Sequence, residues 1–404
     1  MVCATDIWSM GEGKGAPTIY RTLKAFSDAG HTVHLVLPGR GRPLPDLPGV
    51  RFHGLPFVTT PTRARPARSL IGRAWRKLGV AVLFPLLAAW RARGVLQREQ
   101  IDLLYGYEVQ GTLAVRLLRR FKRLPTVTRF QGTVLSADAN GALSRLRKLD
   151  HVLALKTRAD LYIMTDDGTL GDETLTLLNP GARKRMRFWR NGIDLPRFTP
   201  AAKREAAAIR KGLGLPARAP VAFASSRLVW WKRLDRAIRV WPRVVARHKG
   251  ALLLIAGEGD ERPRLEEMAR SLGIAGNVRF LGARPQEEIV NYLRAADIFV
   301  SVNDLSNAGN PLMEAAACGA AIVTLDNGST ARLVQDGVTG RLLAPDDDDA
   351  LAEAVLRLIE HPDERERLGK AARAFAVETF WSWDDRMSAE VQAVSELVSG
   401  GGRG

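Results

Sequence analysis

The sequence of 404 residues is poor in the residues that build disulfide frameworks and metal sites. It has two cysteines, Cys3 and Cys318, which lie far apart, and six scattered histidines. This pattern provides no disulfide scaffold and no recognisable metal-ligand spacing. We therefore expect no metal and no cofactor, and the low cysteine content favours a reducing cytoplasm.

Long apolar runs are also missing. The longest, from Val80 to Trp90, has eleven residues and includes Pro85, whereas a helix that spans a bilayer needs about 20 residues. The first residues contain no basic leader, and Asp6 interrupts any apolar run there. We expect neither a signal peptide nor a transmembrane helix. A hydrophobic content of 46% over this length predicts a globular protein of two domains.

Acidic residues are scarce only in the first half. The net charge is +17, and residues 1–200 hold 32 Lys/Arg against 15 Asp/Glu, whereas residues 201–404 hold 28 of each. Between residues 51 and 100 there are ten basic residues and a single acid, Glu99. Such an excess points to an anionic partner. We do not expect nucleic acid, because the second half is neutral and no nucleic-acid-binding module is recognisable.

Strand-like and helix-like segments alternate along both halves of the chain. This alternation predicts two α/β domains, each built on a parallel, doubly wound sheet. A Pro/Ala/Lys-rich stretch at residues 194–220 indicates the junction. The expected strands are residues 2–5, 32–37, 50–55, 101–105, 126–130, 161–164 and 186–189, then 221–225, 251–256, 278–281, 297–302 and 321–325.

Residues 296–319 read as a buried strand, a loop of small and turn-forming residues, and a helix. The helix is expected to begin at Pro311, with Glu314 in its first turn. A helix N-terminus presents unpaired N–H groups and partial positive charge, which suits an anion such as a diphosphate. A carboxylate beside it can accept hydrogen bonds from hydroxyls. The alternative is an ordinary turn in which Glu314 only complements the helix dipole.

Two other strand ends carry candidate ligand-binding residues. After Ser226 the loop places Arg227 and Lys232 at the end of a strand, where α/β sheets bind ligands. Two cations there can stabilise the charge of a departing diphosphate, although a solvated basic loop has the same composition. Gly257 and Gly259 follow an apolar strand and allow close approach of a ligand, or serve as a tight turn.

Together these segments resemble the donor-binding domain of retaining glycosyltransferases of family 4. These enzymes have the GT-B fold, in which two Rossmann-like domains face each other across an interdomain cleft. The resemblance covers essentially the whole second half. It is carried by Ser226-Arg227-Leu228 with Lys232, Gly257-Glu258-Gly259, Phe280-Leu281-Gly282, Gly309-Asn310-Pro311-Leu312-Met313-Glu314-Ala315, Gly337–Gly340 and Phe380-Trp381-Ser382-Trp383. It implies an acceptor domain at residues 1–195, a donor domain at 196–379, and a C-terminal helix at about 380–400 that returns to the first domain.

The resemblance implies transfer of a sugar from a UDP- or GDP-sugar to a glycan or lipid-linked acceptor, with retention and without a metal. It implies that Arg227 and Lys232 hold the diphosphate and that Glu314 holds the ribose hydroxyls. These three are the expected catalytic residues. The expected donor contacts are Gly13, Gly15, Ser226, Gly257, Gly259, Leu281, Asn307, Gly309, Asn310, Pro311 and Leu312.

Two positions depart from the family pattern. Ser306 stands where the family commonly has a second glutamate, and Asp304 or Asn307 are its candidate substitutes. On the acceptor side, Gln131 and Gly132 stand where many relatives carry a histidine followed by glycine. Since glutamine cannot act as a base, a front-face mechanism is expected, in which the leaving phosphate takes the acceptor's proton. A non-catalytic protein that binds a sugar nucleotide or a glycan is the alternative.

The basic segment from Arg63 to Arg98 has two interpretations. As an amphipathic element, apolar residues such as Trp75 and Trp90 enter an anionic leaflet while its arginines contact headgroups. Alternatively, its apolar stripe faces the core and its basic face is solvated. The first interpretation predicts a cytoplasmic protein peripheral to the inner membrane face, with a role in cell-envelope polysaccharide or glycolipid synthesis.

Overall fold

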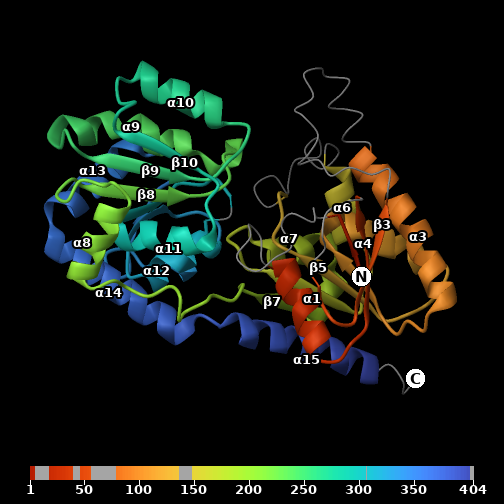
Figure 1. The fold of residues 1–404 in the computed structure, drawn as a ribbon. Helices are drawn as coiled ribbons and strands as arrows, with labels where there is room; N and C mark the ends of the chain where they lie inside the picture. The colour runs from red at the N-terminus through yellow and green to blue at the C-terminus, as the bar shows by residue number, and fades with distance from the viewer. Residues whose placement is uncertain (5–17, 40–45, 56–78, 136–147, 306, 401–404) are drawn as a thin grey trace. The chain divides into compact units, whose positions relative to one another are not determined.

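The computed structural model describes residues 1–4, 18–39, 46–55, 79–135, 148–305 and 307–400. Contacts divide the chain into two compact units (Figure 1). Unit 1 comprises Met1–Asp166, Leu170–Arg190 and Trp383–Gly404, and unit 2 comprises Asp167–Thr169 and Asn191–Ser382. Each unit is a parallel α/β domain of the Rossmann type, which confirms the predicted fold class.

In the described part of unit 1, seven parallel strands form one sheet in the order β3-β2-β1-β4-β5-β6-β7. The order reverses between β1 and β4, and open α/β sheets bind ligands at the carboxyl ends of the strands beside such a reversal. The strands are β1 (Val2–Cys3), β2 (Val33–Pro38), β3 (Val50–Leu55), β4 (Leu104–Tyr107), β5 (Thr126–Phe130), β6 (Leu161–Thr165) and β7 (Met186–Trp189).

Helices cover both faces of this sheet. On one face, α3 (Phe84–Arg98) packs on α4 (Glu108–Leu118), which packs on α6 (Leu149–Leu155) next to α7 (Gly171–Leu178). On the other face, α1 (Thr18–Asp28) lies beside α15 (Trp383–Gly400), the last helix of the chain (Figure 1). The C-terminal helix is therefore part of the core of unit 1.

Unit 2 has a sheet of six parallel strands among its described residues, in the order β10-β9-β8-β11-β12-β13. Here the order reverses between β8 and β11, so the carboxyl ends of β10, β9, β8 and β11 lie next to one another. The strands are β8 (Val221–Ser225), β9 (Leu252–Ala256), β10 (Val278–Gly282), β11 (Ile298–Ser301), β12 (Ala321–Leu325) and β13 (Arg341–Leu343).

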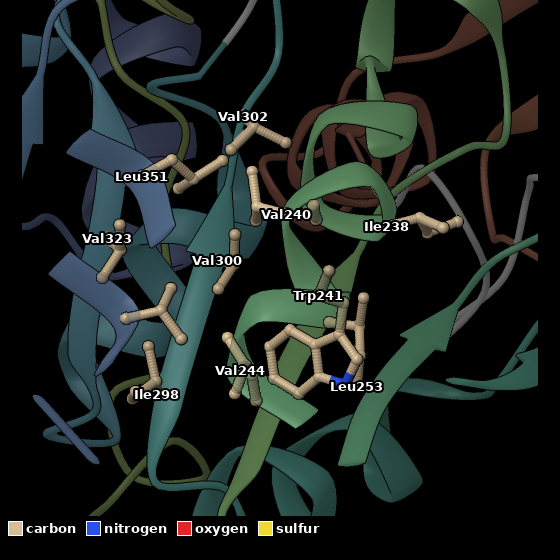
Figure 2. Packing of buried hydrophobic residues seen from close by; sticks show 14 of the residues in the cluster. Ile238, Val240, Trp241, Val244, Leu253, Ile298, Val300, Val302, Val323 and Leu351 are labelled. Carbon is tan, nitrogen blue, oxygen red and sulfur yellow. The ribbon is translucent and has the colours of Figure 1, made fainter. Parts of the chain in front are cut away.

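Apolar side chains on both faces bury this sheet between two helical layers, as expected for parallel strands. Trp241 of α9 (Leu234–Arg247) belongs to one buried cluster with Leu253 and Val300 (Figure 2). Two further helices lie on this face, α10 (Arg262–Ser271) and α13 (Asp348–Glu360). The opposite face is covered by α8 (Lys203–Gly212), α11 (Gln286–Ala295), α12 (Asn310–Ala317) and α14 (Pro362–Thr379).

The structure differs from the expected elements at several places. The junction expected at residues 194–220 contains helix α8, and strand β13 was not expected. Helix α12 begins at Asn310, one residue before Pro311, so Glu314 lies in its second turn and not in its first. No helix among the described residues has both the length and the apolar character needed to cross a membrane.

Candidate functional site

The loop after β8 carries the two predicted cations. Arg227 is exposed, and its guanidinium lies 5.5 Å from the centre of the Trp231 ring. Lys232 ends a short 3-10 helix, η5 (Trp230–Lys232), and its Nζ donates to the Leu305 carbonyl at 3.4 Å. Desolvation lowers the pKa of Lys232 to about 8, with Asp167 opposing this shift and Arg227 adding to it. The lysine is therefore mostly charged at neutral pH, and a bound anion would replace its lost hydration.

The glycine loop after β9 lies directly against this cationic loop. A Cβ on Gly257 would lie 1.8 Å from the Ser226 carbonyl oxygen, and a Cβ on Gly259 would lie 2.1 Å from that of Leu228. The Gly257 amide donates to the Gly282 carbonyl at 2.8 Å, which adds the end of β10 to the same group of loops. The two glycines are thus required for contact between the loops, independently of any ligand.

The N-terminus of α12 is the third predicted part of the site. Gly309 is its N-cap residue, and the amides of Leu312 and Met313 already donate to the Gly309 carbonyl at 3.1 and 3.3 Å. The Leu312 side chain lies in the core, and its expected role as a donor contact stays a prediction. Asn310 accepts a hydrogen bond from the Asn191 side chain at 3.1 Å. Gly309 and Asn310 remain the candidates for anion contact.

Glu314 lies in the next turn of α12 and is only 7% exposed. It is brought together with Gln286, the first residue of α11, whose Nε2 donates to its Oε1 at 2.9 Å. Burial raises the pKa of Glu314 to about 7, although the Gln286 hydrogen bond and the charge of Arg197 both oppose the shift. The carboxyl group is therefore partly protonated at neutral pH and can both donate and accept hydrogen bonds.

The polar residues of the β11 loop are used to hold loops together. Asn307 is buried, and its side-chain oxygen accepts a hydrogen bond from the Asn303 backbone amide at 3.0 Å. Its side-chain nitrogen donates to the Asn303 carbonyl at 2.8 Å and to the Asn327 side-chain oxygen at 2.7 Å. Asp304 pairs with Arg233 at 3.2 Å and with Arg236 at 2.6 Å. Asn307 thus holds loops together, its expected donor contact stays a prediction, and Asp304 is held by two arginines.

A segment from the first half of the sequence also belongs to this group of loops. Residues Asp167–Thr169 are part of unit 2 by their contacts. A Cβ on Gly168 would lie 3.0 Å from the Ala308 amide, and a Cβ on Gly328 would lie 1.7 Å from the Gly168 carbonyl oxygen. The negative charge of Asp167 raises the pKa of Lys232, the last residue of η5. Sequence reasoning missed this segment, because nothing local connects it with the second half.

In unit 1, the predicted acceptor-side residues lie at the carboxyl ends of β4 and β5. The Gln131 side-chain nitrogen donates to the Tyr107 hydroxyl at 2.7 Å, and the Gln131 backbone amide donates to the Glu108 carboxylate at 2.8 Å. Glu108 has φ of 62° and Gly132 has φ of 116°. A non-glycine residue with positive φ at a strand end marks a strained position of the kind found at functional sites. Glu108 was not predicted, although an acid directly after a strand was its signal in the sequence.

A buried ionic network lies beneath this polar cluster. Glu390 of α15 accepts from Arg129 at 2.8 Å, from Arg386 at 2.9 Å and from the Tyr105 hydroxyl at 2.6 Å. Burial alone would raise the pKa of Glu390, but the two arginines and these hydrogen bonds hold it below its usual value. The network fixes α15 to β4 and β5.

Those predicted donor residues that the structure describes all lie in unit 2, whereas Gln131 and Gly132 lie in unit 1. Gly13, Gly15 and Ser306 lie outside the described residues. In the part of the chain that is described, no cluster of three His, Cys, Asp or Glu residues could hold a metal ion. The predicted residues that lie in β10, in the loops after β8, β9 and β11, or in α12 are Ser226, Arg227, Lys232, Gly257, Gly259, Leu281, Asn307, Gly309, Asn310, Pro311, Leu312 and Glu314.

Two doubly wound Rossmann-type units in one chain are the architecture of the GT-B class. Residues 205–375 match the family described as glycosyl transferases group 1, and residues 15–167 match the glycosyl transferase 4-like domain. The chain belongs to the GT-B glycosyltransferases of the family 4 type.

Similarity to curated proteins runs over part of each relative. A stretch of 201 residues is 35% identical to the GDP-mannose-dependent monoacylated alpha-(1-6)-phosphatidylinositol monomannoside mannosyltransferase of Corynebacterium glutamicum, covering 48% of this chain and 52% of that protein. A stretch of 279 residues is 30% identical to the glycogen synthase of Mycobacterium tuberculosis, covering 68% and 64%. The matches thus span about half to two thirds of these relatives.

Solved structures resemble the fold over nearly the whole chain. Sucrose-phosphate synthase from Thermosynechococcus elongatus gives a TM-score of 0.79 at 19% identity, covering 99% of this chain and 98% of that one. HepE of Anabaena, solved in complex with UDP and glucose, gives 0.72 at 19% identity with 98% of each chain covered. At these identities the likeness supports the fold.

Proposed function

We propose that this glycosyltransferase moves a sugar from a nucleotide-sugar donor to an acceptor hydroxyl with retention at the anomeric carbon and without a metal. The observation that carries the proposal is that the loop after β8, with Arg227 and Lys232, contacts the loop that leads from β11 into α12: the Lys232 Nζ donates to the Leu305 carbonyl at 3.4 Å beside the strand reversal of unit 2. The donor class is further supported by a relative named for GDP-mannose and by a structural neighbour that binds UDP. The proposed donor is a UDP-sugar or a GDP-sugar.

In the proposed donor site, Arg227 and Lys232 bind the diphosphate, and the amides at Gly309 and Asn310 meet a phosphate or the sugar. Charge grows on the diphosphate as the bond to the anomeric carbon breaks. Cations placed in advance, one of them poorly hydrated, stabilise that charge more than they stabilise the ground state. Glu314, half protonated and anchored by Gln286, is proposed to bind the ribose hydroxyls.

Unit 1 is proposed to hold the acceptor at the ends of β4 and β5. Gln131 is already engaged with Tyr107 and Glu108, and an amide cannot remove a proton. In the proposed front-face reaction, the acceptor oxygen bonds to the anomeric carbon on the face that the diphosphate leaves. The acceptor's proton passes to the departing phosphate oxygen, so the protein supplies position and electrostatic stabilisation, not a base.

The proposed acceptor is a glycan or a lipid-linked molecule. The mannosyltransferase relative acts on a phosphatidylinositol mannoside according to its name, and further relatives are named D-inositol 3-phosphate glycosyltransferases. With the basic first half, these names support a role in envelope glycolipid or polysaccharide synthesis at the inner membrane face. Residues 63–78 of the segment expected to contact the membrane lie outside the described residues.

Hydrolysis of UDP- and GDP-sugars by the purified protein tests the proposal. We expect slow hydrolysis that falls about 100-fold or more in Arg227→Ala and in Lys232→Ala, because each removes a charge that acts in the transition state. Arg270→Ala, which removes an exposed arginine of α10, is the matched control and should keep full activity. Tight nucleotide-sugar binding without any turnover, even with candidate acceptors, would instead favour the non-catalytic alternative.

A further inference from the structure

Helix α3 of unit 1 (Figure 1) carries buried apolar side chains on one side and exposed ones on the other. Its inner face packs on the sheet and on α4 through Phe84, Ala88, Ala89, Ala92 and Val95. Four apolar side chains, one from the N-cap residue Leu83 and three from α3 itself, are exposed at positions i, i+3, i+4 and i+7, and we name them the α3 stripe. They are Leu83, Leu86, Leu87 and Trp90, which are 51%, 50%, 39% and 73% exposed.

An exposed stripe of this kind calls for a partner, because soluble proteins rarely leave large apolar side chains contiguous on the surface. The sequence alone allowed these residues to be a stripe that faces the core. The structure shows that Phe84, the alanines and Val95 face the core, whereas the leucines and Trp90 face outward. Among the described residues of unit 1, the stripe is thus not needed for packing of the core.

Arginines follow the stripe along the same helix. Trp90, Arg91, Arg93 and Arg98 line a surface hollow of about 350 Å³. The Arg93 guanidinium lies 4.6 Å from the ring centre of Phe121, which is itself 59% exposed just beyond the end of α4. The apolar surface therefore continues from α3 to the end of α4, with cationic groups beside it.

We propose that the α3 stripe inserts into the headgroup region of an anionic lipid bilayer, with Arg91, Arg93 and Arg98 binding lipid phosphates. Leucines followed by a tryptophan suit the boundary between acyl chains and headgroups, where tryptophan is enriched. Arginines beside them add attraction to anionic lipids. The one acid of this helix end, Glu99, is paired with Arg51 at 3.1 Å and does not offset these arginines.

Other partners fit this surface less well. Nucleic acid would engage the arginines but leave the leucines in water. The core of a protein interface is depleted of charged residues, whereas arginines flank this stripe within one helical turn. The inference deepens the proposed function, since it places the acceptor-binding unit at a membrane surface. Lipid binding itself requires neither the donor nor turnover.

Vesicle flotation with the full chain tests the inference. We expect binding to vesicles of phosphatidylcholine with about 30% phosphatidylglycerol, much weaker binding to phosphatidylcholine alone, and partial release at about 0.5 M salt. The double variants Leu86→Ser/Trp90→Ser and Arg91→Glu/Arg93→Glu should each reduce binding by about tenfold or more. Leu177→Ser and Arg183→Glu/Lys184→Glu change exposed residues elsewhere on unit 1 and should bind as the unchanged protein does.

Quenching of tryptophan fluorescence by brominated lipids gives a positive signal for insertion. Trp90→Phe should keep vesicle binding but lose a large share of the quenching, because phenylalanine preserves the apolar contact without the fluorophore. Equal binding by all variants would overturn the inference, as would binding indifferent to anionic lipid. If the unchanged protein did not bind vesicles but bound itself or duplex DNA, and the stripe variants lost that binding, the membrane inference would be overturned. The stripe would then be assigned to a second copy of the chain or to DNA.

The same variants separate this inference from the proposed function. Donor hydrolysis without vesicles should be unchanged in the stripe and arginine variants, because α3 lies in unit 1 and carries no residue of the proposed donor site. Full hydrolysis with lost vesicle binding supports both ideas. Vesicle binding without hydrolysis would reject the enzyme and retain the membrane surface.

Discussion

Lys232 combines a positive charge with poor hydration, and this makes ligand binding depend on pH. Its pKa of about 8 means that the ammonium loses its proton as the pH rises through 8. We expect the affinity for UDP or GDP to fall by about tenfold between pH 7 and pH 9, because the unprotonated amine no longer attracts the diphosphate. Isothermal titration calorimetry at the two pH values measures this change.

Lys232→Arg provides the matched control for this prediction, since a guanidinium remains charged throughout that range. The variant should bind more weakly at pH 7, where its geometry is altered, but show little further loss at pH 9. Titration of the nucleotide itself affects both proteins equally. An equal fall in the two proteins would show that the lysine's proton does not control binding.

Glu314 makes stability depend on pH in the opposite way to an ion-paired carboxylate. Its pKa is raised to about 7 in the folded protein, so between the unfolded value and 7 the folded state binds more protons than the unfolded state. Stability therefore decreases as the pH rises through this window. Relative to Glu314→Gln, the unchanged protein should lose about 2–3 kcal/mol between pH 5 and pH 8. Urea unfolding of both proteins at the two pH values measures the difference; a pH-independent difference would contradict the assigned burial effect.

At the scale of loops, Gly259 tests whether close contact between the β8 and β9 loops is needed for the donor site. A methyl group there would collide with the Leu228 carbonyl oxygen, and backbone must move to accommodate it. We expect Gly259→Ala to cost about 1–3 kcal/mol of unfolding free energy and to reduce donor hydrolysis. Gly276→Ala is the control, since no atom lies within 4 Å of its added carbon. Equal behaviour of the two variants would show that the loops tolerate separation.

Helix α15 depends on one buried carboxylate for its attachment to unit 1. Glu390→Ala would leave Arg129 and Arg386 buried without their negative partner, and removal of one partner of a buried pair costs about 3–5 kcal/mol. Urea unfolding should therefore show a large loss of stability. Glu396→Ala, which changes an exposed acid of the same helix, should lie within about 0.5 kcal/mol of the unchanged protein. A comparable loss in both variants would show that helix propensity, and not the ion pairs, explains the effect.

The strands could be predicted where a short apolar run ends in a turn signal, and the missed elements lack that signal. Strands β3, β5, β7, β8 and β12 have the expected bounds. Helix α8 was missed because it is strongly polar and buries none of its residues fully, so its sequence resembles that of a linker. Strand β13 has three residues at the sheet edge, too few for a period to be visible.

The candidate site was predictable only where its residues directly follow a strand. Arg227 and Lys232 could be assigned in this way, because parallel strands end at one edge of the sheet. The partner of Glu314 could not be found, since Gln286 lies 28 residues away and the pairing depends on how α11 packs. The structural role of Asn307 likewise depends on Asn303 and Asn327, which meet it only in the folded loops.

On the scale of the whole molecule, charge and function are divided between the two units. The excess of basic residues lies in the first half of the sequence, whereas the proposed diphosphate site lies in unit 2, which comes mainly from the balanced second half. The overall charge of +17 is therefore not a consequence of donor binding. Part of the excess of basic residues lies instead on α3, next to the exposed stripe, where we propose that it contacts a membrane.

This division predicts that a nucleotide stabilises one unit more than the other. Differential scanning calorimetry should resolve two transitions, because each unit has its own sheet and core. A ligand at 100 times its dissociation constant stabilises the state that binds it by about 2.7 kcal/mol, which for a domain of this size raises the melting temperature by about 5–10 °C. UDP or GDP should shift one transition by this amount in the unchanged protein and much less in Lys232→Ala. If both transitions moved together, the nucleotide contacts could not be confined to unit 2, and the assignment of the donor to that unit alone would fail.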